Sequence, residues 1–188
     1  LQATNQIYDE KLFDIRLETQ KISDTINSFL GWAELENSPN KKELFANKLS
    51  QVIHNLTDRM PDHFNHVRLD LRTDLIVPAY PEHLEQLIQN LMQNALKHSG
   101  EKAKITIELN GRNLCLIDNG PGIPSEVLAR LGEPFNRGNI KATDGRGHGL
   151  GLAWANSICR RYGWDLSFKT TASGTTAVVK FNEDTMIS

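Results

Sequence analysis

Two asparagines stand four residues apart in the stretch Asn90-Leu-Met-Gln-Asn-Ala-Leu-Lys-His-Ser99, which has the composition of a helix. Residues at positions i and i+4 share a helix face, so Asn90 and Asn94 point the same way, with Lys97 one turn later. Neutral oxygen ligands beside a cation suit Mg²⁺ with bound phosphates, because Mg²⁺ prefers oxygen ligands and keeps water and phosphate in its coordination shell. Asparagines on a solvated helix face are common, so this stretch alone is weak evidence.

Three further stretches follow in order. Asp118-Asn-Gly-Pro-Gly-Ile-Pro124 comes directly after an apolar run, so its carboxylate lies at the end of a buried strand and can accept from an exocyclic amine. Glu133-Pro-Phe-Asn-Arg-Gly138 has a lone Phe and Arg in a loop. Gly145–Leu152 combines glycines with the start of a helix, which lets backbone N–H groups approach phosphate. Each stretch alone is also a plausible turn, but all four in this order predict a nucleotide-binding site.

The spacing differs from that of better-known nucleotide-binding folds. No Gly-x-x-x-x-Gly-Lys-Ser/Thr motif occurs, and the glycine run comes after Asp118 instead of opening a strand–turn–helix unit. The four stretches resemble the N, G1, F and G2 boxes of the ATP-binding domain of sensor histidine kinases, a domain type shared with gyrase, Hsp90 and MutL. The resemblance covers residues 68–183. It implies ATP and Mg²⁺ as cofactors and the receiver domain of a response regulator as a partner.

The resemblance also implies a role for each matching residue. Asn94, helped by Asn90, would hold Mg²⁺, and Lys97 would face the phosphates. His98 would stack on the adenine, although a histidine at a helix end can equally face solvent. Asp118 would accept a hydrogen bond from the adenine amine. The other implied members of the nucleotide site are Gly120, Gly122, Ile123, Phe135, Arg137, Arg146, Gly147, His148, Gly149, Leu150, Gly151 and Thr175.

One position separates two branches of this group of proteins. The hydrolytic members have a Glu four positions before the metal-binding Asn, where it activates water. Here that position is Asn90, and an amide is not a general base at ordinary pH. The sequence therefore favours phosphoryl transfer to a protein side chain over hydrolysis of ATP.

The chain is expected to divide into a helical dimerisation domain over 1–65 and a catalytic ATP-binding domain over 66–188. The first helix has an apolar seam with steps of four and three, typical of a coiled coil, formed by Tyr8, Leu12, Ile15, Thr19, Ile22, Ile26, Phe29 and Ala33. Turn residues over 36–42 precede a second expected helix, with a seam of Phe45, Leu49, Val52 and Leu56. Such a hairpin forms a four-helix bundle in a homodimer, or folds onto its own ATP domain.

After residue 66 the pattern changes to strands mixed with helices. Strands are predicted over 67–72, 103–109, 113–117, 165–171 and 175–181, and helices over 81–99, 125–131 and 150–161. Because the two types do not strictly alternate, the fold class is α+β, with a helical hairpin followed by a two-layer α/β sandwich. Residues 136–148 have few apolar side chains and no periodicity, which fits a lid that nucleotide orders.

The sequence departs from the family at the phosphate acceptor, because the first 53 residues contain no histidine. The best match to the acceptor motif is Phe13-Asp-Ile-Arg16, with Phe13 in the place of the nucleophile and Asp14 able to orient a restored histidine there. His54, on the second expected helix, is the other candidate. Three classes stay open: the catalytic core of a sensor histidine kinase, a phosphatase-type or non-enzymatic regulator that binds ATP, and an anti-sigma-type serine kinase.

Composition narrows the setting of the protein. A formal net charge of −2 gives no sign of nucleic-acid binding. Cys115 and Cys159 have no CxxC spacing and indicate reduced core thiols. No apolar run reaches the length of a membrane span, and no signal peptide is visible. We therefore expect a cytoplasmic module without membrane contact in these residues. Because the first residue is Leu1 and not Met, we expect a piece of a longer chain. The resemblance implies a membrane segment upstream, which is typical of the family.

Overall fold

Five strands form the main sheet, in the order β2-β4-β5-β7-β6. The computed structural model describes residues 11–12, 15, 19, 26, 30–31, 44–59, 67–99, 103–123, 128 and 151–182. The strands of the sheet are β2 (Val67–Leu71), β4 (Ile105–Asn110), β5 (Asn113–Asp118), β6 (Asp165–Thr171) and β7 (Gly174–Lys180). Strands β2 and β4 are parallel, and the other neighbours are antiparallel. All five strands were predicted from the sequence, and the structure confirms them.

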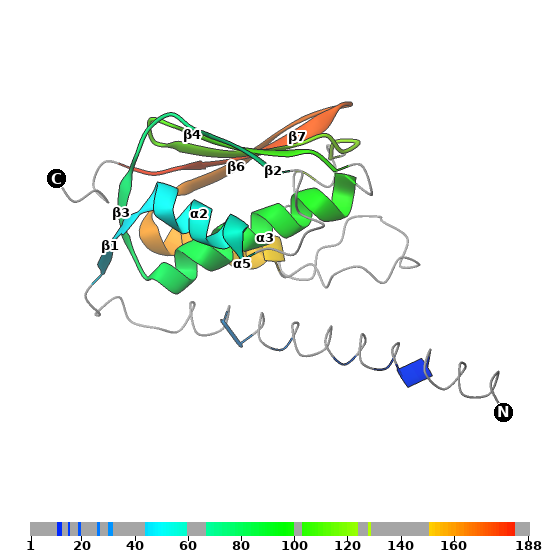
Figure 1. The fold of residues 1–188 in the computed structure, drawn as a ribbon, viewed down its shortest axis with the longest axis horizontal. Helices are drawn as coiled ribbons and strands as arrows, with labels where there is room; N and C mark the ends of the chain where they lie inside the picture. Colours follow the sequence, from blue (N-terminus) through cyan, green and yellow to red (C-terminus); the bar gives the residue numbers. More distant parts are fainter. Residues whose placement is uncertain are drawn as a thin grey trace.

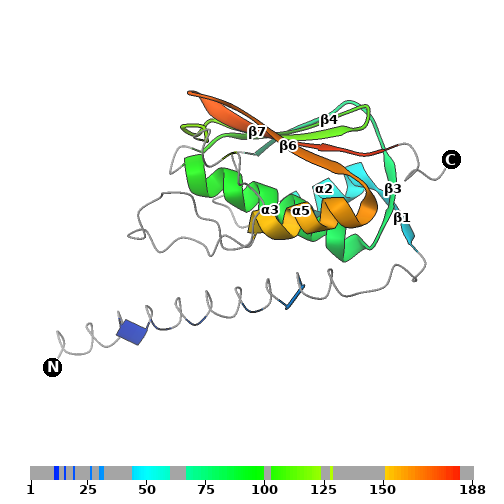
Figure 2. The ribbon, with the colours of Figure 1, turned by 180° about the vertical axis from the view of Figure 1, so that it is seen from behind.

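Three helices cover one face of this sheet (Figures 1 and 2). They are α2 (Leu49–Asp58), α3 (Pro81–Ser99) and α5 (Gly151–Tyr162). Side chains alternate across each strand, so every second residue of β4 and β7 faces the helices and is buried. Each buried Leu or Ile in this layer stabilises the fold by roughly 1.5–3 kcal/mol. The predicted two-layer α/β sandwich is confirmed, and α3 and α5 lie side by side in it.

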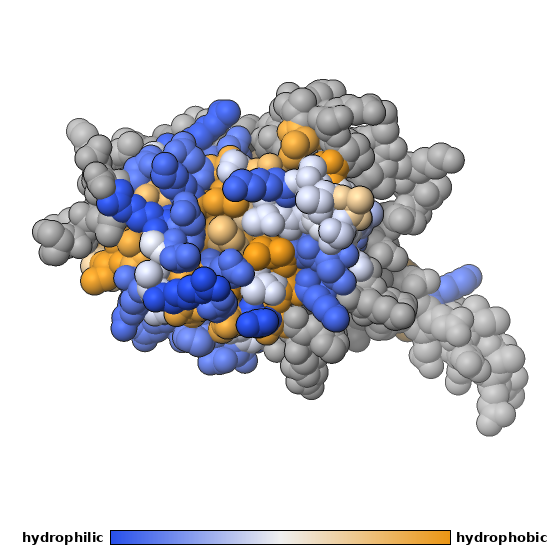
Figure 3. Space-filling view, turned by 90° about the horizontal axis from the view of Figure 1, so that it is seen from above, coloured by the Kyte–Doolittle hydropathy of each residue, from blue (hydrophilic) through white to orange (hydrophobic). Residues whose placement is uncertain are grey.

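The other face of the sheet has no helix over it among the described residues. Half-buried Cys115 and Val178 lie there beside exposed Ser167, and Lys169 is also exposed. Seen from above, hydrophobic and hydrophilic residues are mixed on this side of the molecule (Figure 3).

Burial raises the pKa of both cysteine thiols, that of Cys159 to about 12, so both are neutral at pH 7.

The prediction of the second hairpin helix is wrong in its first part. Residues Phe45–Lys48 form strand β1, which pairs antiparallel with β3 (Ile76–Ala79), and helix α2 begins only at Leu49. The cause is a long-range contact, because the buried Asn47 side-chain amide donates to the carbonyls of Val77 (3.2 Å) and Ala79 (2.8 Å). A helical period in the sequence cannot reveal a strand partner about thirty residues away.

The apolar side chains of α2 belong to the core of the α/β unit. Leu49 and Ile53 are fully buried, and Leu56 is 8% exposed, in one cluster with α3 and the sheet. Phe45, expected on the same seam, is 58% exposed on β1. Helix α2 therefore packs onto the α/β unit of its own chain. This agrees, for the second half of the hairpin, with the alternative to a four-helix bundle.

The described residues between positions 11 and 31 are all helical, as predicted. The seam residues Leu12, Ile15 and Ile26 are 57%, 61% and 52% exposed. The polar member of the seam, Thr19, bonds its hydroxyl to the Ile15 carbonyl at 2.7 Å, so that hydroxyl is satisfied within the helix. The remaining seam positions, at 8, 22, 29 and 33, lie outside the described residues.

One close contact links the first helix to α5. Gly31 lies so close to the ring of Trp154 on α5 that a Cβ at this position would overlap the indole. Residues 125–131 and 136–148, expected as a helix and a lid, lie outside the described residues apart from Leu128, which is helical. Among the helices that the structure describes, none is long and apolar enough to cross a membrane.

Candidate nucleotide-binding site

Helix α3 places the predicted amides and the cation on one face. Pro81 starts the helix, where its fixed φ is favourable and its missing N–H costs nothing, and the last turn contains Lys97 and His98. Asn90 is only 6% exposed, Asn94 is half-buried, and Lys97 and His98 are exposed. The polar face therefore runs from the core outwards along α3, towards the end that carries the positive charge.

Asn90 is held at the bottom of this face. Its Oδ1 accepts a hydrogen bond from Gln86 Nε2 at 3.1 Å, whereas its Nδ2 is buried with no partner among the described residues. A Cβ at Gly151 would lie 3.4 Å from the same Oδ1, so the first residue of α5 sits against this amide. An unpaired buried donor costs about 1–3 kcal/mol, and it suits an acceptor such as a phosphate oxygen better than a metal ion.

Asp118 ends strand β5 with one oxygen already engaged. Oδ1 accepts from the backbone N–H of Gly120 at 2.8 Å and from that of Thr175 at 3.1 Å. Both hydrogen bonds that described residues make to this carboxylate end on Oδ1. The carboxylate is therefore fixed in rotation, and Oδ2 is the oxygen that can accept from a ligand amine.

The turn after Asp118 packs closely on the tip of the β6–β7 hairpin. Gly122 has φ +81°, and a Cβ there would overlap the Thr171 carbonyl and lie 2.7 Å from Thr170 Oγ1. Gly174 has φ +151°, and a Cβ there would overlap the carbonyl of Asp118. Both positions therefore require glycine, for the conformation and for the close approach of two backbones.

His98 lies next to this turn. Its backbone carbonyl would be 3.1 Å from a Cβ at Gly120, so the end of α3 contacts the turn directly. The pKa of His98 lies below its usual value, because protein atoms displace water from part of the ring and the Lys97 ammonium repels a second cation, while Asp118 acts in the opposite direction. A neutral imidazole at pH 7 can stack on an aromatic base without competing for the Asp118 carboxylate.

The structure thus gathers two groups of predicted residues. Asn90 meets Gly151 at the junction of α3 and α5. At the ends of α3 and β5, the structure gathers His98, Asp118, Gly120, Gly122, Ile123 and Thr175. Asn94 and Lys97 lie on the polar face of α3 that joins these groups. Outside the described residues lie Phe13, Asp14 and the predicted site residues Phe135, Arg137, Arg146, Gly147, His148, Gly149 and Leu150.

Two polar residues of the site were not predicted. Gln86 orients Asn90. The sequence could have indicated this contact, because Gln86 stands four residues before Asn90 and so shares its helix face. Thr170 Oγ1 accepts from the N–H of Ile123 at 2.6 Å, and no local pattern announces that contact because the two residues are far apart in sequence.

A metal ion at this site would depend on few protein ligands. Across the part of the chain that the structure describes, no group of three or more His, Cys, Asp or Glu side chains can hold a metal. Asn94 is half-buried on the polar face of α3, and its side-chain oxygen is a suitable ligand for Mg²⁺. Nucleotide phosphates and water would have to complete the coordination.

Comparisons with known proteins agree with this geometry. Residues 79–185 match the family described as histidine kinase-, DNA gyrase B-, and HSP90-like ATPase. Sensor protein QseC of Salmonella typhi is 30% identical over 152 residues, which are 80% of this chain and 32% of that protein. Sensor histidine kinase CssS of Bacillus subtilis is 28% identical over 111 residues, which are 57% and 23%. The chain thus spans about a third or less of the length of these curated relatives.

Solved structures show the same fold. The histidine kinase AdeS of Acinetobacter baumannii has a TM-score of 0.69 at 23% identity, covering 91% of this chain and 83% of that one. The cytoplasmic segment of histidine kinase QseC has a TM-score of 0.63 at 19% identity, covering 89% and 94%. Full-length ShkA in complex with AMPPNP has a TM-score of 0.71 at 18% identity, covering 88% and 36%. The chain belongs to the histidine kinase-, gyrase- and HSP90-like ATPase family, as a catalytic domain of the sensor histidine kinase type.

Proposed function

We propose that this chain binds ATP with Mg²⁺ and transfers the γ-phosphoryl group to a histidine, from which a response regulator receives it. The observation that carries the proposal is the orientation of the Asp118 carboxylate. Two backbone N–H groups hold its Oδ1 at 2.8 and 3.1 Å, which leaves Oδ2 oriented to accept from the adenine amine. A guanine would present a carbonyl oxygen at the same place and be repelled, so this carboxylate selects adenine.

The amide at position 90 supports transfer over hydrolysis. Asn90 is buried and cannot take a proton from water, so no general base stands where the hydrolytic relatives have Glu. Its buried Nδ2, which has no partner among the described residues, can donate to a phosphate oxygen. Asn94 would hold Mg²⁺, which neutralises phosphate charge when bound, and Lys97 would face the phosphates.

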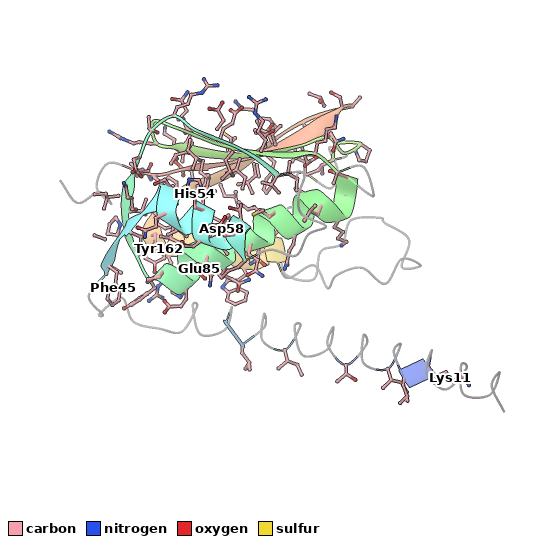
Figure 4. All side chains as sticks on the ribbon, viewed as in Figure 1. Lys11, Phe45, His54, Asp58, Glu85 and Tyr162 are labelled. Carbon is pink, nitrogen blue, oxygen red and sulfur yellow. The ribbon has the colours of Figure 1, made fainter. Side chains whose placement is uncertain are left out.

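We also propose that the α/β unit begins by Leu44, not at residue 66. The support is the burial of Leu49, Ile53 and Leu56 in one core with α3 and the sheet. The motif Phe13-Asp-Ile-Arg16 places Phe13 at the acceptor position on the first helix of a hairpin over 1–65, and this change takes the second helix out of that hairpin. His54 is exposed on α2, which we assign to the ATP unit (Figure 4). We infer that the acceptor histidine lies neither at position 13 nor at position 54.

Labelling with γ-phosphate tests this inference. The chain should bind ATP yet form no acid-labile, base-stable phosphate, and Phe13→His should also stay unlabelled. Label in Phe13→His would restore the hypothesis of a lost acceptor, with Asp14 orienting the new imidazole. Label in the unmodified chain that His54→Ala abolishes would put the acceptor on α2. Label that is stable in acid would instead favour a serine kinase.

We propose a homodimer through the seam of the first helix. Leu12, Ile15 and Ile26 are each more than half exposed in the single chain, and such a row of apolar side chains is favourably buried against a second copy. Light scattering at tens of micromolar should give the mass of a dimer. Ile15→Asp should shift it to monomer, whereas Lys11→Gln, at a position that is not one of the apolar seam positions, should not. A monomeric mass for the unmodified chain would contradict the proposal.

A further inference from the structure

The loop that follows Asp118 is tied to strand β6 by a side chain that the family motifs do not include. Thr170 Oγ1 accepts a hydrogen bond from the backbone N–H of Ile123 at 2.6 Å. Ile123 and Thr170 are both half-buried, so water replaces this bond poorly. Gly122, directly before Ile123, approaches the same hydroxyl and the Thr171 carbonyl so closely that no side chain fits. The far end of the loop therefore rests on β6.

The near end of the loop is tied to the neighbouring strand. The N–H of Thr175 on β7 donates to Asp118 Oδ1, and Gly174 packs against the carbonyl of Asp118. Thr170 and Thr175 are direct register partners in the antiparallel β6–β7 pair. One pair of positions on the hairpin thus holds both ends of the loop, with Asp118 at one end and Ile123 at the other.

The two ties act on the same carboxylate. The N–H of Gly120, inside the loop, is the second donor to Asp118 Oδ1 at 2.8 Å. If Ile123 loses its acceptor on β6, the loop is free to move and Gly120 N–H can leave the carboxylate. The carboxylate can then rotate about its last torsion, which is broad for Asp, and Oδ2 no longer points in one direction.

We propose that Thr170 is a positioning residue of the base pocket, whose hydroxyl sets the orientation of Asp118 through the loop 119–123 and thereby the preference for adenine. The inference rests on the proposed binding of ATP. It adds to that function a residue that touches no nucleotide. Loss of the hydroxyl should weaken ATP binding and, in particular, reduce discrimination between ATP and GTP, because discrimination depends on the direction of one acceptor oxygen.

Three variants of the full chain test the role of this hydroxyl. Thr170→Val keeps the shape of the side chain and removes the acceptor, and Thr170→Ser keeps the acceptor. Thr176→Val is the matched control, since Thr176 is half-buried on β7 with no side-chain hydrogen bond to a described residue. Calorimetric titration should show ATP affinity reduced about three- to tenfold in Thr170→Val, with a smaller ATP-to-GTP ratio. Thr170→Ser and Thr176→Val should bind as the unmodified chain does.

The remaining outcomes decide the inference. Unchanged ATP affinity and ratio in Thr170→Val, or no rescue by Thr170→Ser, would overturn it. If Thr170→Val does not fold, amide exchange at Ile123 in Thr170→Ala should be faster than in Thr170→Ser, and equal rates would overturn it. Weakened ATP binding in Asp118→Asn together with unchanged ATP affinity in Thr170→Val sinks this inference alone. An unmodified chain that binds no ATP sinks the proposed function as well.

Discussion

Asp118→Asn should weaken ATP binding by about 1–3 kcal/mol, which corresponds to a loss of affinity of about 5- to 150-fold. The structure makes the direction of this effect specific. Because Gly120 and Thr175 both donate to Oδ1, the amide of the variant must turn its oxygen towards them. Its NH₂ group then occupies the place of Oδ2 and faces the amine of the adenine, so that a donor meets a donor.

The same argument predicts little loss of stability in this variant, since both backbone hydrogen bonds survive. Calorimetric titration gives the affinity, and thermal unfolding checks the fold. Asp165→Asn is the matched control, because it makes the same change of charge on an exposed residue. Asp165 is at the start of β6, away from the end of β6 that contacts the turn after Asp118, so this variant should bind ATP normally. Equal affinities of Asp118→Asn and the unmodified chain would remove Asp118 from the nucleotide site.

Gly174→Ala should destabilise the fold by about 3 kcal/mol or more and abolish ATP binding. The residue has φ +151°, and its new methyl group would overlap the carbonyl of Asp118. Relief requires β7 to move away from the end of β5, which breaks the hydrogen bond from Thr175 to Asp118. Stability and nucleotide binding should therefore fall together. Urea denaturation measures the first, and titration at a temperature where the variant is folded measures the second.

Gly163→Ala separates backbone strain from steric overlap. Gly163 also has a positive φ, +68°, but a Cβ there would meet no atom within 4 Å. This control should cost only the strain of a left-handed residue, about 1–2 kcal/mol, and leave ATP affinity unchanged. If the two alanine variants are equally stable, the close approach of β7 to Asp118 does not constrain the fold.

The α/β unit could be predicted from local patterns because its elements satisfy local rules. Helix α3 begins at a proline, continues with apolar residues at helical spacing and ends with basic residues, so its bounds of 81 and 99 follow from the sequence alone. Strand β6 likewise has the predicted bounds of 165 and 171. The position of Asp118 at the end of a strand could be predicted for the same reason, since it ends an apolar run and precedes a glycine-rich turn.

Strand β1 and the packing of α2 could not be predicted in this way. Residues 45–56 have an apolar period that fits a hairpin seam and a core-facing helix equally well. The decision depends on Asn47, whose amide has its acceptors on β3, and on the apolar side chains of α3 that cover Leu49 and Ile53. These partners are distant in sequence, so no window of local sequence contains the information.

The sequence by itself determined the family of the catalytic domain, because its four motifs follow one another in an order that few other families share. It also determined the strands and helices whose periodicity is complete within one segment. Only the tertiary structure decided which oxygen of Asp118 is free, that Gln86 engages Asn90, and that Thr170 holds the loop 119–123. Each of these depends on the direction of a hydrogen bond, and direction is set by how the elements pack after the chain has folded.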